Sequence, residues 1–279
     1  MTPSAIDWLA LTVLLASLLL GAWRGLLYEV LSLAGWVVAF LAARWAAPVV
    51  GDWLPMGESS EPLRYAAGFA LVFIATAFLC GMLAALAREH GIWLIGGTLP
   101  LVSADAGKVL NTTLVYDPQG RNVSRYDKIH LFGFTKGSES YDEARTIVPG
   151  QAVGSFEAPF GRVGLSVCYD LRFPELYRAM GECALIVVPA AFTHTTGSAH
   201  WEVLLRARAI ENQCYVLASA QGGTHQNGRR TFGHSMLVDP WGEVKAVLRE
   251  GEGVVKGELD PAFLAGVRES LPALRHRKL

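Results

Sequence analysis

Three long runs of uncharged, mostly apolar residues dominate the first 88 positions and restrict what this part of the chain can become. Glu29 is the one charged residue within them, and they span Trp8–Trp23, about Leu26–Ala43 and Tyr65–Ala87. The third run has 23 residues, which is long enough to cross a bilayer as a helix. Tryptophan and tyrosine lie near the run ends, as is typical of membrane interfaces. These features predict three transmembrane helices within residues 1–88, with membrane lipid as a partner.

A set of buried helices in a large soluble core is the alternative for this segment, although uncharged runs of this length more often insert into a membrane. The arginines do not decide the orientation. Arg24 and Arg88 fall on one side of the predicted spans, and Arg44 and Arg64 fall on the other. We expect the C-terminal part to lie in the cytoplasm, because its sequence has the character of a cytosolic enzyme.

The overall charge and the cysteine pattern exclude several classes of protein. The formal net charge is −1, from 24 basic and 25 acidic residues, so no nucleic-acid partner is expected. Cys80, Cys168, Cys183 and Cys214 are scattered without Cys-x-x-Cys spacing, which argues against a disulfide framework and a zinc site. The seven histidines also lack the spacing of metal ligands.

From Gly91 onward, apolar runs alternate with polar turns and one helical pattern. Helical spacing covers residues 199–212, and residues 130–150 form a long polar connection. Mixed strands and helices predict an α/β layered domain over residues 89–279. Strands are expected at 92–99, 109–116, 123–128, 163–167, 184–189, 214–220, 235–238 and 254–259.

The stretch Gly161–Tyr177 carries the strongest chemical signal in the sequence. An apolar run ends just before Cys168, and Pro174 with Glu175 marks the start of a helix. A strand-to-helix turn exposes a side chain at the edge of the sheet and directs backbone N–H groups toward whatever that side chain attacks. Cys168 is therefore a candidate nucleophile, and a buried structural cysteine is the alternative.

Two further residues become candidates for a catalytic site when they are considered together with Cys168. Lys128 ends an expected strand and Glu143 lies in the polar connection, and each alone is most simply a surface residue. Together with Cys168 they make residues 87–279 resemble the nitrilase, or carbon–nitrogen hydrolase, superfamily. The most similar subgroup resembles the amidases that act on deaminated glutathione, and the motifs that carry this likeness are Phe192–Trp201, Leu204–Tyr215 and Phe232–Trp241.

The resemblance implies a four-layer αββα sandwich that dimerises and hydrolyses a small-molecule amide without a metal or organic cofactor. Cys168 would attack the amide carbonyl to form a thioester, while Lys128 and the backbone N–H of Tyr169 stabilise the oxyanion. Glu143 would match a carboxylate that positions the lysine. The resemblance places five residues near the substrate: Tyr169, Arg172, Thr193, His194 and Trp201. A place in the protein core is the alternative for Trp201, as it is for Arg206 and Arg208.

Residues 5–87 resemble the start of the colicin V production protein family. The residues that carry this likeness are Asp7-Trp8, Gly21–Gly25 and Glu29–Gly35. That family has four spans, whereas three are predicted here. The resemblance implies a multi-pass protein of the bacterial inner membrane with the hydrolase domain on its cytoplasmic side.

The general-base glutamate of the nitrilase superfamily lies on an early strand, upstream of the segment that matches Gly91. In this chain the membrane-like segment stands at that place, so the hydrolase domain is expected to be truncated at its N-terminal end. No residue is assigned as the base, because the upstream glutamates lack a strand context: Glu29, Glu58, Glu61 and Glu89. Three interpretations stay open: an anchored amidase, a membrane protein carrying an inactive amidase remnant, and a fusion product without function.

Overall fold

The computed structural model describes residues 61–278, apart from 106, 138 and 227, together with residues 43, 44, 47, 50, 52 and 54. The first apolar run, nearly all of the second, and the motifs shared with the colicin V production family lie outside the described residues. The chain divides into two compact units. The first contains residues 1–94 and 116–122, and the second contains residues 95–115 and 123–279.

The third apolar run lies in helix α3, Glu61–His90, which belongs to the first unit. A Cβ atom on Gly120 would lie 2.4 Å from the carbonyl oxygen of Ala84, and the φ angle of Gly120 is +76°. Both the close approach and the left-handed backbone require glycine at this position. In the described part of the chain, no helix has the length and apolar character that a membrane span requires.

A small sheet is centred on β3, which pairs with β1, β2 and β4. The expected strand at 109–116 is confirmed, and the one at 123–128 is shifted by one residue. The single strand expected at 92–99 is wrong, because the chain turns at Gly97 (φ +66°) and forms two short strands instead. The four strands are β1 Leu94–Ile95, β2 Leu99–Val102, β3 Val109–Tyr116 and β4 Asn122–Asp127.

A second, larger sheet has the strand order β14-β13-β10-β9-β8-β7. Its central strands β8, β9 and β10 are parallel, and the outer strands pair in antiparallel fashion. The first four residues of β9 are all buried, which is typical of a strand covered on both faces. The strands are β7 Gly154–Ala158, β8 Gly161–Leu165, β9 Leu185–Ala190, β10 Tyr215–Ala220, β13 Ser235–Val238 and β14 Val244–Leu248.

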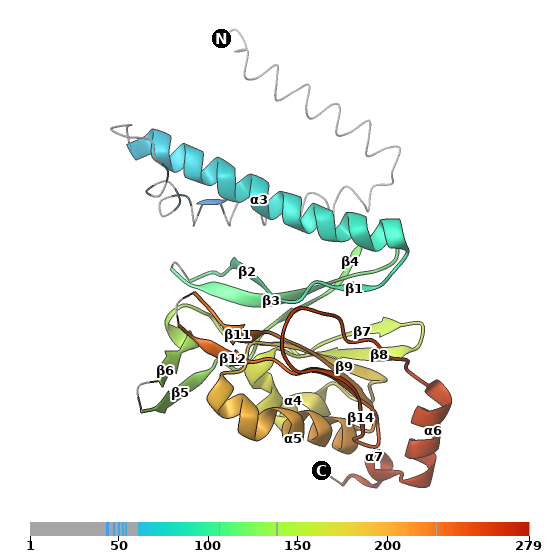
Figure 1. Cartoon of the computed structure of the whole chain (residues 1–279). Helices are drawn as coiled ribbons and strands as arrows, with labels where there is room; N and C mark the ends of the chain where they lie inside the picture. Colours follow the sequence, from blue (N-terminus) through green and yellow to red (C-terminus); the bar gives the residue numbers. More distant parts are fainter. Residues whose placement is uncertain are drawn as a thin grey trace. The chain divides into compact units, whose positions relative to one another are not determined.

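The two sheets lie face to face, and helices α4 and α5 cover the outer face of the larger sheet (Figure 1). Arg208 of α5 is 4% exposed and donates hydrogen bonds of 3.0 and 2.8 Å to the carbonyl oxygen of Leu171, which ties the helix to the turn after β8. This layering is the expected nitrilase-like α/β fold. The helices of the second unit are α4 Pro174–Ala179, α5 His194–Asn212, α6 Pro261–Ser270 and α7 Ala273–His276, with 3₁₀ helices η1 Glu143–Arg145 and η2 Cys168–Arg172.

Two hairpins and one missing strand depart from the sequence-based expectation. The connection at 130–150 contains the hairpin β5 Gly133–Lys136 and β6 Glu139–Asp142, whose short strands hold one aromatic residue each and give no apolar alternation. A second hairpin joins β11 Gly222–Thr224 to β12 Arg230–Phe232. The strand expected at 254–259 is wrong. Val254 there is 77% exposed and has no sheet to pack on.

Candidate active site

Cys168 stands where the backbone turns from strand β8 into the 3₁₀ helix η2. Its φ angle is +52°, in the left-handed region that residues other than glycine rarely adopt. Such strain persists only where the surroundings fix the backbone. The N–H of Val167 donates to the Asp170 carboxylate at 2.9 Å, and the Ser166 hydroxyl donates to the carbonyl of Val187 at 3.0 Å. Both residues before the cysteine are therefore held in place.

Lys128 directly follows strand β4 and is 1% exposed. Its backbone N–H donates to Asn111 at 2.8 Å, and its carbonyl accepts from Gly150 at 2.8 Å, so the segment is fixed on both sides. Its ammonium group is paired with the carboxylate of Glu143, which also accepts a 2.8 Å hydrogen bond from the N–H of Phe132. A buried lysine needs such a partner, because desolvation of an unpaired charge is costly.

Burial raises the pKa of the Cys168 thiol above its ordinary value. The charge of Lys128 and a hydrogen bond with the backbone of Ala191 lower this pKa, and the charge of Glu143 raises it again. The net direction is upward, so the neutral thiol is favoured, and an attack by this sulfur would first require a proton acceptor. Burial also raises the pKa of Cys183, to about 11, but that side chain is 1% exposed, whereas Cys168 is partly exposed.

Tyr169 and Arg172 of η2 lie together beside the cysteine. The guanidinium of Arg172 stands 5.7 Å from the centre of the Tyr169 ring and 5.3 Å from that of Phe192. Burial lowers the pKa of Arg172, while the groups of Tyr169 and Cys168 raise it. Among the described residues no carboxylate pairs with this cation, and its polar contact is with Nδ1 of His200 at 3.2 Å. A half-buried guanidinium in this setting is suited to bind an anion.

The other three residues expected at the substrate have different surroundings. Thr193 caps α5, and its hydroxyl oxygen accepts a 3.3 Å hydrogen bond from the N–H of Thr196. His194 stands edge-on to Phe232. Trp201 is 1% exposed and donates its indole N–H to the carbonyl of His234 at 2.8 Å, which favours the core alternative for this residue.

Three polar residues near the site were not expected from the sequence. Arg229, in the turn between β11 and β12, lowers the pKa of Cys168, donates to the carbonyl of Ala191 at 2.7 Å and lies 5.3 Å from the Tyr141 ring centre. No local pattern marks it, because it lies far from Cys168 in the sequence. Asp170 and His130 contact each other, and an aspartate two residues after the candidate cysteine was the signal that the sequence offered.

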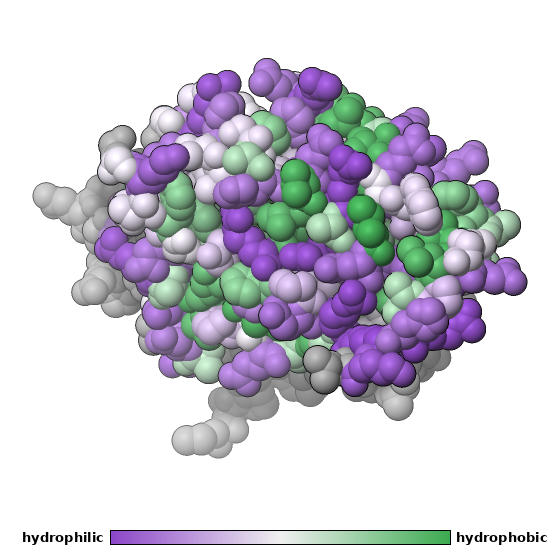
Figure 2. Space-filling model, turned by 90° about the horizontal axis from the view of Figure 1, so that it is seen from below, coloured by the Kyte–Doolittle hydropathy of each residue, from purple (hydrophilic) through white to green (hydrophobic). Residues whose placement is uncertain are grey.

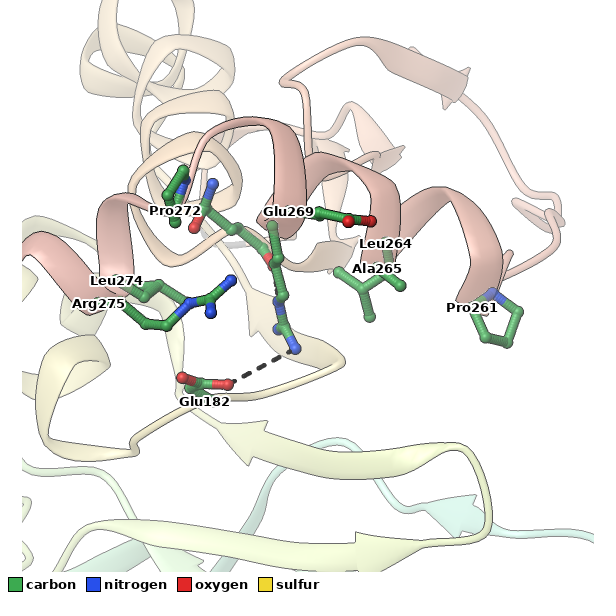
Figure 3. Close-up of a pocket in the computed structure, with 10 residues that line it drawn as sticks. Glu182, Pro261, Leu264, Ala265, Glu269, Pro272, Leu274 and Arg275 are labelled. Carbon is green, nitrogen blue, oxygen red and sulfur yellow. Dashed lines mark hydrogen bonds and ion pairs between the residues drawn. The ribbon is translucent and has the colours of Figure 1, made fainter.

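A cavity of about 550 Å³ lies elsewhere in the second unit, against α6 and α7 (Figure 3). Leu264 and Leu274 form part of its wall, and Glu182 pairs with Arg268 across it at 3.9 Å. The described residues that line this cavity include no cysteine, serine or lysine, so it offers no nucleophile of the kind that Cys168 provides.

Comparisons with known families match both parts of the chain. The family described as carbon-nitrogen hydrolase matches residues 53–269, and the family described as colicin V production protein matches residues 6–99. Both resemblances are confirmed. The hydrolase match begins well before residue 87, where it was expected, and includes all of α3. The predicted boundary at residues 88 and 89 falls within the overlap of the two matches and stays a prediction.

Individual relatives point to amidases. A deaminated glutathione amidase from Yersinia enterocolitica is 42% identical over 198 residues, which cover 69% of each chain. The omega-amidase NIT2 of Homo sapiens is 41% identical and covers 70% of this chain and 71% of its own. Among solved structures, Nit3 of Saccharomyces cerevisiae, a member of branch 10 of the nitrilase superfamily, has a TM-score of 0.64, 32% identity and 72% coverage of both chains.

Proposed function

The chain belongs to the carbon–nitrogen hydrolase family, and from this premise we propose that it is an amidase that hydrolyses a small ω-amide through a thioester at Cys168. The observation that carries the proposal is the geometry of Cys168. This cysteine is a partly exposed residue at a left-handed turn, and the charge of Lys128 and the backbone of Ala191 both favour the ionised form of its thiol. Omega-amidases and deaminated glutathione amidases among the relatives suggest the substrate class.

In the first half of the reaction, the Cys168 thiol loses its proton and attacks the amide carbonyl. The oxyanion that forms is stabilised by the ammonium of Lys128 and by the backbone N–H of Tyr169, the residue that follows the nucleophile. Glu143 is our candidate for the proton acceptor, because its carboxylate charge acts on Cys168 in this structure. The leaving nitrogen takes that proton and departs as ammonia or an amine.

In the second half, water attacks the thioester carbonyl. Glu143 accepts a proton from this water, the C–S bond breaks, and the carboxylic acid product leaves as Cys168 recovers its proton. One carboxylate thus serves both halves, and Lys128 stabilises an oxyanion in each. This scheme gives Glu143 the role of the base that the upstream segment was expected to lack.

Arg172 is our candidate for the group that selects the substrate. Its guanidinium is half-buried between two aromatic rings and is available to a carboxylate of the substrate. An ω-amide with a carboxylate at its other end would satisfy this cation while its amide carbonyl meets Cys168.

The test is amide hydrolysis by the purified full-length chain. Ammonia release from primary ω-amides and cleavage of deaminated glutathione would be followed for the unchanged chain, for Cys168→Ala and for Cys183→Ala as the matched control. We expect hydrolysis that is lost in Cys168→Ala and kept in Cys183→Ala. A folded chain that hydrolyses none of these amides would support the alternative of an inactive amidase remnant.

We also propose that residues 1–88 anchor a hydrolase domain, residues 89–279, to the cytoplasmic face of the bacterial inner membrane. The match of residues 6–99 to the colicin V production protein family supports a membrane association, as do the first two apolar runs. The test is fractionation of cells that express the full chain, with an alkaline wash of the membranes. Recovery of the chain in the soluble fraction would contradict the anchor.

A homodimer through the hydrolase domain is the further part of the proposal. Val203 and Ile210, seven positions apart on α5, are 66% and 49% exposed, and Trp241 is 60% exposed. Figure 2 shows apolar residues in several groups among polar ones on the face seen from below. Light scattering of the detergent-solubilised chain would measure its mass, and Val203→Glu should shift a dimer toward the monomer.

A further inference from the structure

The carboxylate of Asp170 is fully buried and joins two segments that are distant in sequence. Its Oδ2 accepts hydrogen bonds from the Tyr126 hydroxyl at 2.7 Å and from the N–H of Val167 at 2.9 Å. Its Oδ1 lies 3.0 Å from the backbone nitrogen of His130, which donates to it, and 2.8 Å from Nδ1 of the same residue. Asp170 itself is 0% exposed, so these four contacts satisfy both oxygens without solvent.

The partners of Asp170 surround the two groups that the proposed reaction needs. Tyr126 and His130 lie two residues before and two residues after Lys128, and Val167 directly precedes Cys168. One carboxylate therefore connects the strand that ends at the lysine with the turn that presents the thiol. The ring of His130 is stacked on Phe173, with 3.7 Å between the ring centres, which holds it against the carboxylate.

We propose that Asp170 is a positioning residue that sets the place of the Lys128 ammonium relative to the Cys168 thiol. This inference rests on the proposed function only because that function is what requires Lys128 and Cys168 to act together. Asp170 does not exchange protons with the substrate, because both of its oxygens are occupied and solvent does not reach it. Its effect on the reaction passes through Lys128 and Cys168.

The two tyrosines that face Asp170 stay protonated near neutral pH. Tyr126 of β4 and Tyr177 of α4 have pKa values raised by burial and by the charge of Asp170, while Arg208 of α5 lowers the pKa of Tyr177. His130 is the remaining titratable neighbour. The carboxylate therefore sits among hydrogen-bond donors whose arrangement a change at Asp170 would disturb.

A positioning role and a mere charge effect predict opposite results for Asp170→Asn. If Asp170 acted only as a negative charge near Cys168, its removal would lower the pKa of the thiol, because a like charge disfavours the thiolate. If Asp170 positions Lys128, its replacement loosens the lysine and raises that pKa. A purely structural role would change the melting temperature and leave the pKa where it was.

The experiment measures the rate of Cys168 alkylation by iodoacetamide against pH in the full-length chain, by mass spectrometry of the peptide. For Asp170→Asn we expect about tenfold slower labelling near neutral pH, the change that one pKa unit produces. Lys128→Met should slow labelling in the same direction. The double variant should be no slower than the slower single variant, because both act through one group. Additive shifts, or an unchanged or lowered pKa in Asp170→Asn, would overturn the proposal.

Two milder variants keep the test decisive if Asp170→Asn does not fold. Tyr126→Phe and His130→Asn each remove one contact with the carboxylate and leave the others, and each should raise the thiol pKa by less than Asp170→Asn. If both variants fold and the rate of Cys168 labelling is unchanged in each, the proposal is overturned. Labelling does not require hydrolysis, so a chain that shows the expected shifts but cleaves no amide would refute the proposed function and leave this inference standing.

Discussion

The two sides of the candidate site are built differently. On the Cys168 side, Ser166 and Asp170 are 1% and 0% exposed, and each is hydrogen bonded to a neighbouring segment. On the other side, Glu143 follows a surface strand, β6, whose residues alternate between half-buried and exposed, and its side chain is 28% exposed. The Lys128 ammonium is fully buried and pairs with this exposed side.

The candidate nucleophile and the carboxylate are therefore controlled in separate ways. The position of Cys168 is fixed by buried contacts that tolerate little change in volume or hydrogen bonding. Glu143 acts mainly through its charge and its reach toward Lys128. We therefore expect changes on the first side to alter stability and geometry, and changes on the second side to alter protonation.

The largest effect is expected for Lys128→Met, which removes the group that pairs with the exposed side. Hydrolysis should fall by about 10³-fold, since a single oxyanion donor contributes about 10²–10³. The pKa of Cys168 should rise, because Lys128 lowers it. Steady-state rates and iodoacetamide labelling measure the two effects. Lys136→Met, at an exposed lysine of the hairpin, is the control, and retained hydrolysis in Lys128→Met would refute the oxyanion role.

Glu143→Gln should separate the two functions of the carboxylate. Hydrolysis should fall by about 10²-fold, the usual contribution of a general base. Labelling of Cys168 near neutral pH should become faster, because the charge of Glu143 raises the thiol pKa and its loss lowers it. In every variant the labelling rate should rise with pH across the neutral range, since the thiol pKa lies above that range. The control is Glu157→Gln at an exposed site, and parallel losses of both rates in Glu143→Gln would contradict this prediction.

Arg172→Met should change substrate recognition more than chemistry. For an ω-amide that carries a carboxylate, KM should rise about tenfold, the loss of roughly one charge-assisted contact, with little change in kcat. A neutral amide of the same length should be unaffected. Steady-state kinetics with the matched pair of substrates measures the difference. An equal KM change for both substrates would show that Arg172 does not bind the carboxylate.

The smallest effects compare packing on the two sides. A Cβ at Gly164 of β8 would lie 2.6 Å from Sδ of Met180 and 3.2 Å from Cγ1 of Ile186, so Gly164→Ala should cost about 1–3 kcal/mol. Gly137 of the hairpin turn has open space and a φ angle of +59°, so Gly137→Ala should cost about 1 kcal/mol through the backbone alone. Thermal unfolding of the full chain measures both losses of stability. A larger loss for Gly137→Ala than for Gly164→Ala would contradict the view that the Cys168 side is the more tightly packed one.

The buried side was also the side that the sequence predicted well. The strands at 109–116 and 235–238 have their expected bounds, because each ends in three apolar residues that an Asp-Pro turn follows. The turn at Cys168 was anticipated from the apolar run before it and from Pro174 after it. Buried strands leave such patterns because most of their side chains are apolar.

The exposed side left weaker signals. The hairpin β5–β6 was missed because its four-residue strands carry one aromatic residue each and otherwise look like a loop. Val254 was mistaken for the start of a strand although it is 77% exposed. Arg229 lies in the turn of the β11–β12 hairpin and donates to the carbonyl of Ala191, 38 positions away, a contact that no local pattern encodes. The same holds for the link between Asp170 and His130.

The left-handed backbone of Cys168 bears on whether this domain is under selection. Any L-residue there is strained by roughly 1–2 kcal/mol, and glycine alone would relieve the strain. A domain that had lost its chemistry would gain stability from a single change at this codon, at no functional loss. Continued use of the sulfur atom would preserve a thiol in so unfavourable a conformation. A fusion partner without function would be free to change to glycine at this position.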